Sequence, residues 1–183
     1  MRLFPIVGLL AALVLTAATS TPASADISPA LVSALVNTNN QSSYHITLAG
    51  KSMGGTSQGD IVKPDKMRMT MPTGASVVIG SVMYLEMNGK WQKMAGGGDW
   101  FAKMNAAKMM NLHRGDYASK DLGMRTISGG AGIYHAYQLT DTKKNLSQTI
   151  YIDSSNRIAR MEMPDMVITF SNFGEHVNIQ APM

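Results

Sequence analysis

The chain has 183 residues, enough for one domain with a sizeable core or at most two small ones. Apolar residues make up 45% of the sequence and charged residues 15%, which argues against intrinsic disorder. The formal net charge of +4 is too mild to indicate a nucleic-acid-binding protein, and the absence of Cys excludes disulfides, thiolate metal sites and a cysteine nucleophile.

The N-terminal residues have the pattern of a secretory signal peptide. Arg2 is followed by an apolar run over residues 3–18, and the stretch ends in small residues, Ala23-Ser24-Ala25. A retained membrane anchor is the alternative, but the apolar run is short for a membrane span. We therefore expect cleavage after Ala25, export, and a periplasmic location in a Gram-negative host.

The exported part begins with a predicted helix. Ser28 can cap it and Pro29 fits its first turn. Four apolar residues follow at helical spacing and predict one buried face: Leu31, Val32, Leu35 and Val36. Asn37-Thr38-Asn39-Asn40 is expected to end the helix.

From residue 43 onward the apolar pattern changes to a period of two, which is typical of β-strands. Strands are expected at about 43–48, 67–71, 77–79, 82–87, 90–93, 121–127, 132–140, 146–152, 157–163, 166–171 and 176–180. Asn88-Gly89 predicts a hairpin turn, and Ser154-Ser155-Asn156 predicts another turn. The glycine-rich stretch 50–59 is expected to be flexible, and a second helix is expected from Asp99 to about His113.

The predicted fold is mainly β with some α structure. A single antiparallel sheet of about nine to eleven strands must curl, so we expect a curved sheet forming an incomplete β-barrel, covered by two helices. Residues 26–183 show no repeat and no linker, and are expected to form a single domain.

No sequence motif points to catalysis or to a metal or cofactor site. The four His residues have no metal-binding spacing, and no GxSxG or HExxH pattern occurs. Ser76 and Ser81 are interpreted as ordinary strand or turn residues. The glycines at 96–98 are not followed by Lys-Ser or Lys-Thr, which argues against a phosphate-binding loop. We expect a protein that is not an enzyme and has no cofactor.

Methionine is the unusual feature, with 16 in the chain. Met67, Met69 and Met71 would all point to one face of a strand. Three interpretations remain open: core packing, a deformable apolar pocket, and a Cu(I) site built from thioethers. The copper interpretation predicts exposed, convergent sulfurs, with His45 or His113 as additional ligands.

The order of these elements resembles the periplasmic lipoprotein-carrier superfamily, which includes LolA, LolB and the mycobacterial LppX/LprG-type lipid carriers. The similarity lies in the N-terminal helix followed by a strand at 44–48, in Gly59-Asp60-Ile61-Val62-Lys63-Pro64 with the strand after it, and in the strand–turn–strand pattern at 150–161 with the closing strands near 167–182. It covers nearly all of the exported chain.

This resemblance implies a half-barrel whose apolar inner face binds a lipid or lipoprotein acyl chain, with an envelope membrane protein as a further candidate partner. The expected lining residues are Met67, Met69, Met71, Met83, Leu85, Met87, Trp91, Phe101 and Met104. Lipoprotein carriers of the family have Arg where this chain has Lys63, which makes Lys63 the candidate for a lid latch. Two alternatives stay open: a Met-rich copper-binding or redox-buffer protein, and a ligand-free envelope domain that binds a partner protein.

Overall fold

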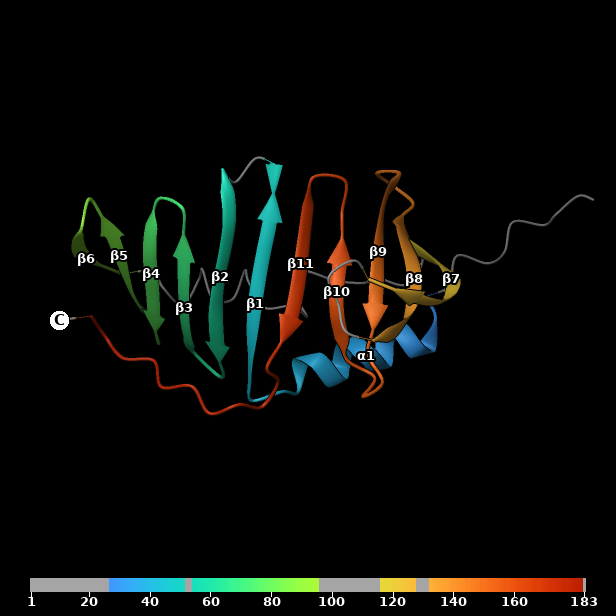
Figure 1. Cartoon of the computed structure of the whole chain (residues 1–183), viewed down its shortest axis with the longest axis horizontal. Helices are drawn as coiled ribbons and strands as arrows, with labels where there is room; N and C mark the ends of the chain where they lie inside the picture. The colour runs from blue at the N-terminus through green and yellow to red at the C-terminus, as the bar shows by residue number, and fades with distance from the viewer. Residues whose placement is uncertain (1–26, 52–53, 96–115, 128–131, 183) are drawn as a thin grey trace, which may run out of the picture.

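The computed structural model describes residues 27–51, 54–95, 116–127 and 132–182. The predicted signal peptide and the predicted second helix lie outside these residues. The described part contains one helix and eleven strands, shown in Figure 1. Their bounds are α1 Pro29–Asn39, β1 Ser43–Gly50, β2 Gly55–Val62, β3 Lys66–Met71, β4 Gly74–Ile79, β5 Val82–Met87, β6 Lys90–Ala95, β7 Tyr117–Thr126, β8 Ile133–Asp141, β9 Leu146–Ile152, β10 Ile158–Glu162 and β11 Met166–Ser171.

All eleven strands form one antiparallel sheet in the order β6-β5-β4-β3-β2-β1-β11-β10-β9-β8-β7. Each strand pairs with its neighbour in sequence except at the centre, where β1 pairs with β11 and joins the two halves of the sheet. β6 and β7 are its two edges, so the sheet is open, and Figure 1 shows the strands near β7 turned relative to the central ones. The predicted class and strand number are confirmed, with one helix among the described residues.

Most strand boundaries follow from local sequence signals. Asn88 and Gly89 adopt φ values of 53° and 71° between β5 and β6, as their hairpin signal predicts. The Asp153 carboxylate accepts hydrogen bonds from the backbone N–H groups of Ser155 and Arg157, which closes the predicted turn before β10. Two expectations are wrong: β2 already begins at Gly55 within the stretch expected to be flexible, and residues 176–180 form no strand.

Helix α1 packs against the sheet with a different stripe from the one predicted. Leu31, Ala34 and Thr38 are buried, whereas Val32 and Val36 are 44% and 51% exposed. The small Ala34 lets the helix approach the sheet closely, and the Thr38 hydroxyl accepts a hydrogen bond from the backbone N–H of β10 residue Ile158 at 2.7 Å. The close approach of α1 to the sheet and this hydrogen bond therefore determine which residues of the helix are buried. The spacing of apolar residues in the sequence does not reveal either of them.

The start of α1 also differs from the prediction. Ser28 occupies the N-cap position, but its side chain makes no capping hydrogen bond. Its backbone N–H instead donates to the Ser119 hydroxyl on β7 at 2.7 Å. Together with the Thr38 contact to β10, this bond lays α1 across the β7–β10 half of the sheet, as Figure 1 shows.

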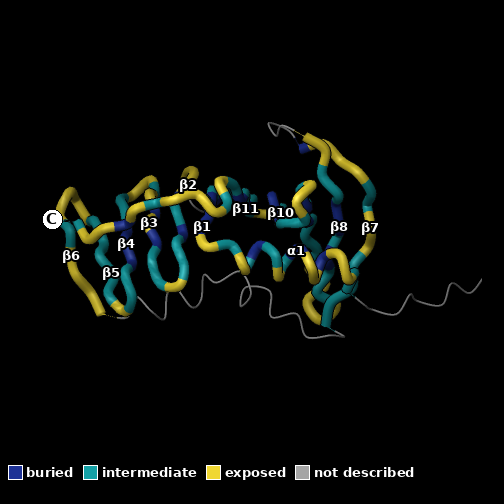
Figure 2. Tube along the Cα trace, turned by 90° about the horizontal axis from the view of Figure 1, so that it is seen from below, coloured by how far each residue is buried: buried dark blue, intermediate teal, exposed yellow. Residues whose placement is uncertain are grey.

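The hydrophobic core lies on the face of the sheet that α1 covers, here called the inner face. Figure 2 shows buried positions along β3, β4 and β8 and on α1, while the loops are exposed. Residues 172–182 leave β11 and run across the lower ends of β2 and β3 (Figure 1), anchored where the Gly174 N–H donates to the Ser43 carbonyl oxygen at 2.9 Å. Within the described residues, no helix has the length and apolar character needed to cross a membrane.

Candidate ligand-binding face

The inner face of β1–β5 carries two continuous rows of side chains. In an antiparallel sheet, residues directly opposite one another point to the same face, and alternate residues of one strand share that face. The first row runs through Tyr44, Ile61, Met67, Val78 and Met83. The second row runs through Ile46, Gly59, Met69, Ser76 and Leu85. None of these ten side chains carries a charge, so the rows form an apolar wall.

The same face continues into the other half of the sheet. A third row links Tyr137, Ile150, Met161, Ile168, Leu48 and Ser57. All but Ser57 belong to one buried cluster that also contains Leu31 and Ala34 of α1. The helix thus covers the β7–β10 side of the inner face, while the methionine-rich side is carried by β3 and β5.

Small residues flank the methionines of β3. Ser57 and Gly59 of β2 lie on one side, and Gly74 and Ser76 of β4 lie on the other. A Cβ atom built on Gly59 would clash with the backbone carbonyl oxygen of Arg68 and would lie 2.5 Å from the sulfur of Met69, so the backbone of β3 and the Met69 side chain together exclude a larger residue here. Because Met is unbranched and flexible, the Met69 side chain can change its conformation more readily than a β-branched one.

The structure brings together six of the predicted lining residues. Met67, Met69 and Met71 on β3, and Met83, Leu85 and Met87 on β5, all point to the inner face by register and alternation. Met67 and Met69 are buried, whereas burial decreases toward β6 and Met87 is 48% exposed. The inner face is therefore closed over β3 and accessible near β5.

Trp91 requires a correction. Gln92 is opposite Leu85 and Trp91 is opposite Glu86, so Trp91 points to the outer face of β6. The sequence pattern of β6 does not fix its register, because a shift of one residue exchanges the two faces. Phe101 and Met104, the other two expected lining residues, lie outside the described residues.

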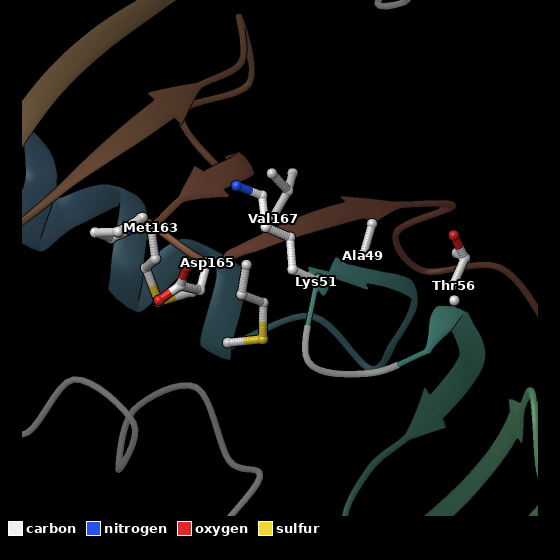
Figure 3. Close-up of a pocket in the computed structure, with 10 residues that line it drawn as sticks. Ala49, Lys51, Thr56, Met163, Asp165 and Val167 are labelled. Atoms are coloured by element: carbon white, nitrogen blue, oxygen red, sulfur yellow. The ribbon is translucent and has the colours of Figure 1, made fainter.

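A groove of about 450 Å³ opens at the upper rim of the sheet, where β1 ends, β2 begins and the β10–β11 turn passes. Figure 3 shows side chains from these three segments facing it, among them Lys51, Met163 and Asp165. Met163 and Met166 also pack against the buried cluster, so the groove adjoins the apolar core. No local sequence pattern indicates this groove, because its walls come from segments more than 100 residues apart.

Lys63 joins the turn after β2 to the end of α1. Its Nζ donates to Oδ1 of Asn39, the last residue of α1, at 3.1 Å. Its backbone N–H donates to the carbonyl oxygen of Ser42 at 2.8 Å, just before β1. Partial burial lowers the pKa of the Lys63 amine below its ordinary value. Lys63 is thus positioned to influence how firmly the end of α1 is held.

The outer face of the same strands is polar. Asp60 accepts a hydrogen bond from Arg68 at 2.8 Å and lies 2.8 Å from the Nδ1 atom of His45. Burial alone would raise the pKa of Asp60, but the hydrogen bonds and charges of these two partners outweigh it and hold the pKa below its usual value.

This arrangement bears on the copper interpretation. His45 lies on the outer face, opposite Asp60, whereas Met67 and Met69 are buried on the inner face. His45 and these two methionines are therefore separated by the sheet, and Met67 and Met69 are not exposed as that interpretation requires. His113 lies outside the described residues.

Two solved structures share this fold. The first is the lipoprotein LppX of Mycobacterium tuberculosis, with 15% sequence identity, a TM-score of 0.61, and coverage of 82% of this chain and 96% of that chain. The second is LprF of Mycobacterium bovis, with 15% identity, a TM-score of 0.63, and coverage of 86% and 99%. No protein-family model matches the sequence, and no curated protein matches it significantly.

Proposed function

We propose that this chain, which has the fold of LppX and LprF, is an exported carrier that binds the acyl chains of a lipid or lipoprotein on the inner face of its sheet. The observation that carries the proposal is the pair of uncharged rows across β1–β5, with flexible methionines between small residues. Each buried methylene contributes about 0.8 kcal/mol, so such a wall favours an acyl chain strongly over water.

The resemblance of the sequence to lipid carriers supports the same class of ligand. The role is non-catalytic: binding and release need only an apolar surface and a way to reach it. The partial exposure of Met87 and the decreasing burial across β5 give such an access route near the β6 edge. The signal peptide over residues 1–25 would deliver the protein to the periplasm, where an envelope membrane protein would donate or accept the lipid.

Native mass spectrometry tests this function. The full chain, with its N-terminal leader, is expressed in a Gram-negative host and purified from the periplasm. We expect a mature chain beginning at Asp26 that carries additional mass, and this mass should dissociate as lipid on denaturation. A chain that is free of lipid, and that takes up none from phospholipid vesicles, would refute the carrier function and favour the partner-binding alternative. Added mass in steps of copper would favour the metal-binding alternative.

A further inference from the structure

In the part of the chain that the structure describes, two buried hydroxyl groups on the inner face have no hydrogen-bond partner. Among the described residues, Ser57 Oγ and Ser76 Oγ are the buried side-chain polar atoms for which the structure provides none. The two residues are only 1% and 2% exposed. An unpaired buried hydroxyl is destabilising, and most buried polar groups in proteins are paired. Their position therefore calls for a partner that the described residues do not supply.

The two hydroxyls flank the methionines of β3. Ser76 on β4 lies opposite Met69 and Leu85, and Ser57 on β2 lies opposite Leu48. Ser76 is two strands away from Ser57 across the sheet and is displaced from it by two residues along the strands. Standard strand spacings therefore place the two serines about 12 Å apart. They cannot bind one atom together, but each can bind a separate atom of an extended ligand.

The side chains around Ser57 and Ser76 determine which kind of ligand atom the two hydroxyls can bind. A hydroxyl donates to an oxygen acceptor, and the second and third rows, which contain Ser76 and Ser57, carry no cationic side chain to neutralise an anion. Burying a carboxylate there without a counter-charge would be costly, whereas an ester carbonyl is uncharged and needs only one donor. A hydrocarbon without oxygen would leave both hydroxyls unpaired.

We propose that Ser57 and Ser76 form an ester-recognition subsite, in which their hydroxyls donate hydrogen bonds to carbonyl oxygens of an ester-linked lipid. The proposal rests on the function proposed above and adds a preference among lipids. Met69 lies opposite Ser76 in the register, with its sulfur over Gly59 on the β2 side, and this flexible side chain can adjust to a ligand that approaches the two hydroxyls.

A matched pair of lipids tests the subsite. Dipalmitoyl phosphatidylglycerol and its dihexadecyl ether analogue have the same headgroup and chain length, but only the first carries carbonyl groups. With one neutral hydrogen bond corresponding to about a fivefold change in affinity, the unaltered protein should prefer the diester about 25-fold. Ser57→Ala and Ser76→Ala should each reduce the preference about fivefold, and the double variant should bind both lipids equally.

Ser147→Ala is the matched control. The Ser147 hydroxyl pairs with that of Thr140 at 2.8 Å on the other half of the sheet, so this variant should retain the full preference for the diester. In the ligand-free protein, Ser57→Ala and Ser76→Ala should leave the thermal midpoint of unfolding unchanged or raise it. A fall of several degrees would show that the hydroxyls are paired within the fold, which would overturn the subsite.

The outcomes separate the subsite from the carrier function. Equal affinity of the unaltered protein for diester and diether, or a preference that survives in the double variant, overturns the ester subsite while lipid binding stands. In that case the two hydroxyls form hydrogen bonds with buried water molecules rather than with the lipid. Failure of the unaltered protein to bind either lipid refutes the carrier function itself.

Discussion

Lys63 and Asn39 are joined by a hydrogen bond of 3.1 Å that ties the turn after β2 to the last residue of α1. This hydrogen bond connects the methionine-rich half of the sheet to the helix that covers the other half. A Lys offers a single compact donor group where Arg would offer a planar fork. This bond adds to the hydrogen bond between Thr38 and Ile158, which also holds the end of the helix.

Lys63→Met should loosen α1. Losing this hydrogen bond should lower the free energy of unfolding by about 1 kcal/mol and speed amide hydrogen exchange in α1 more than in β3. Urea denaturation and exchange followed by mass spectrometry measure the two effects. Lys93→Met, at an exposed position on β6, is the control and should change neither.

A double-mutant cycle with Asn39→Ala isolates the contact. The coupling energy between the two substitutions should be about 1 kcal/mol if the bond persists in solution. Additive effects of Lys63→Met and Asn39→Ala would show that the two residues act independently, and would remove Lys63 as a latch candidate.

Leu85 and Trp91 lie on opposite faces of the neighbouring strands β5 and β6, so substitutions at the two positions should differ in their effect on lipid binding. Leu85→Glu places a charge in the inner-face row, so it should reduce affinity for a diacyl lipid at least tenfold. Trp91→Ala, on the outer face, should leave affinity within about twofold, since only surface contacts change. Displacement of a fluorescent fatty-acyl probe measures both, with far-ultraviolet circular dichroism as the folding control. Loss of binding in the Trp91 variant alone would contradict the face assignment.

The methionines of β3 should act through their shape rather than through sulfur chemistry. Changing Met69 to Leu conserves volume and should cost less than about 1.5 kcal/mol, whereas Met69→Ala should cost about 2–5 kcal/mol because Met69 is buried. Lipid binding should survive replacement of Met67, Met69 and Met71 by Leu. If the triple variant folds but no longer binds lipid, the thioether groups themselves are required and the apolar-wall account is wrong.

Acidification should lower the stability of the folded protein, because it protonates Asp60 on the outer face of the sheet. The pKa of Asp60 is held below its ordinary 3.8 in the folded protein, so its contacts with His45 and Arg68 stabilise the fold above that pH, and this contribution is lost as the pH falls through the folded-state pKa. Asp60→Asn should be less stable at pH 7 but lose less stability on acidification to pH 2. Urea midpoints across this range measure the slope.

The control for Asp60 is Glu175→Gln, at an exposed position in the C-terminal segment. Its acid dependence should match that of the unaltered protein. An Asp60→Asn variant that lost as much stability on acidification as the unaltered protein would show that the contacts of Asp60 with His45 and Arg68 do not stabilise the fold.

Local signals made much of this fold predictable. Asn88-Gly89 specifies its hairpin through backbone preferences of two residues, and the alternation in 67–71 identifies one face of β3 without knowledge of its neighbours. Long-range contacts decided the rest. The face of Trp91 depends on the register with β5, and the buried stripe of α1 depends on its contact with Ile158.

The binding features that the sequence missed share the same cause. Ser76 resembles an ordinary strand or turn residue in sequence, and only its pairing with Met69 and Leu85 reveals an unpaired hydroxyl on an apolar face. The rim groove combines the ends of β1 and β2 with the β10–β11 turn, and no local pattern relates these segments.

Photocrosslinking tests the central claim most directly. The purified full-length protein is incubated with phosphatidylglycerol vesicles containing a lipid that bears a diazirine in its acyl chain, irradiated, and digested for peptide mapping. The account predicts adducts on inner-face residues of β3 to β5, centred on Met69, Val78 and Leu85. Adducts confined to outer-face residues such as Trp91, or no adducts at all, would contradict an acyl chain bound on the inner face of this sheet.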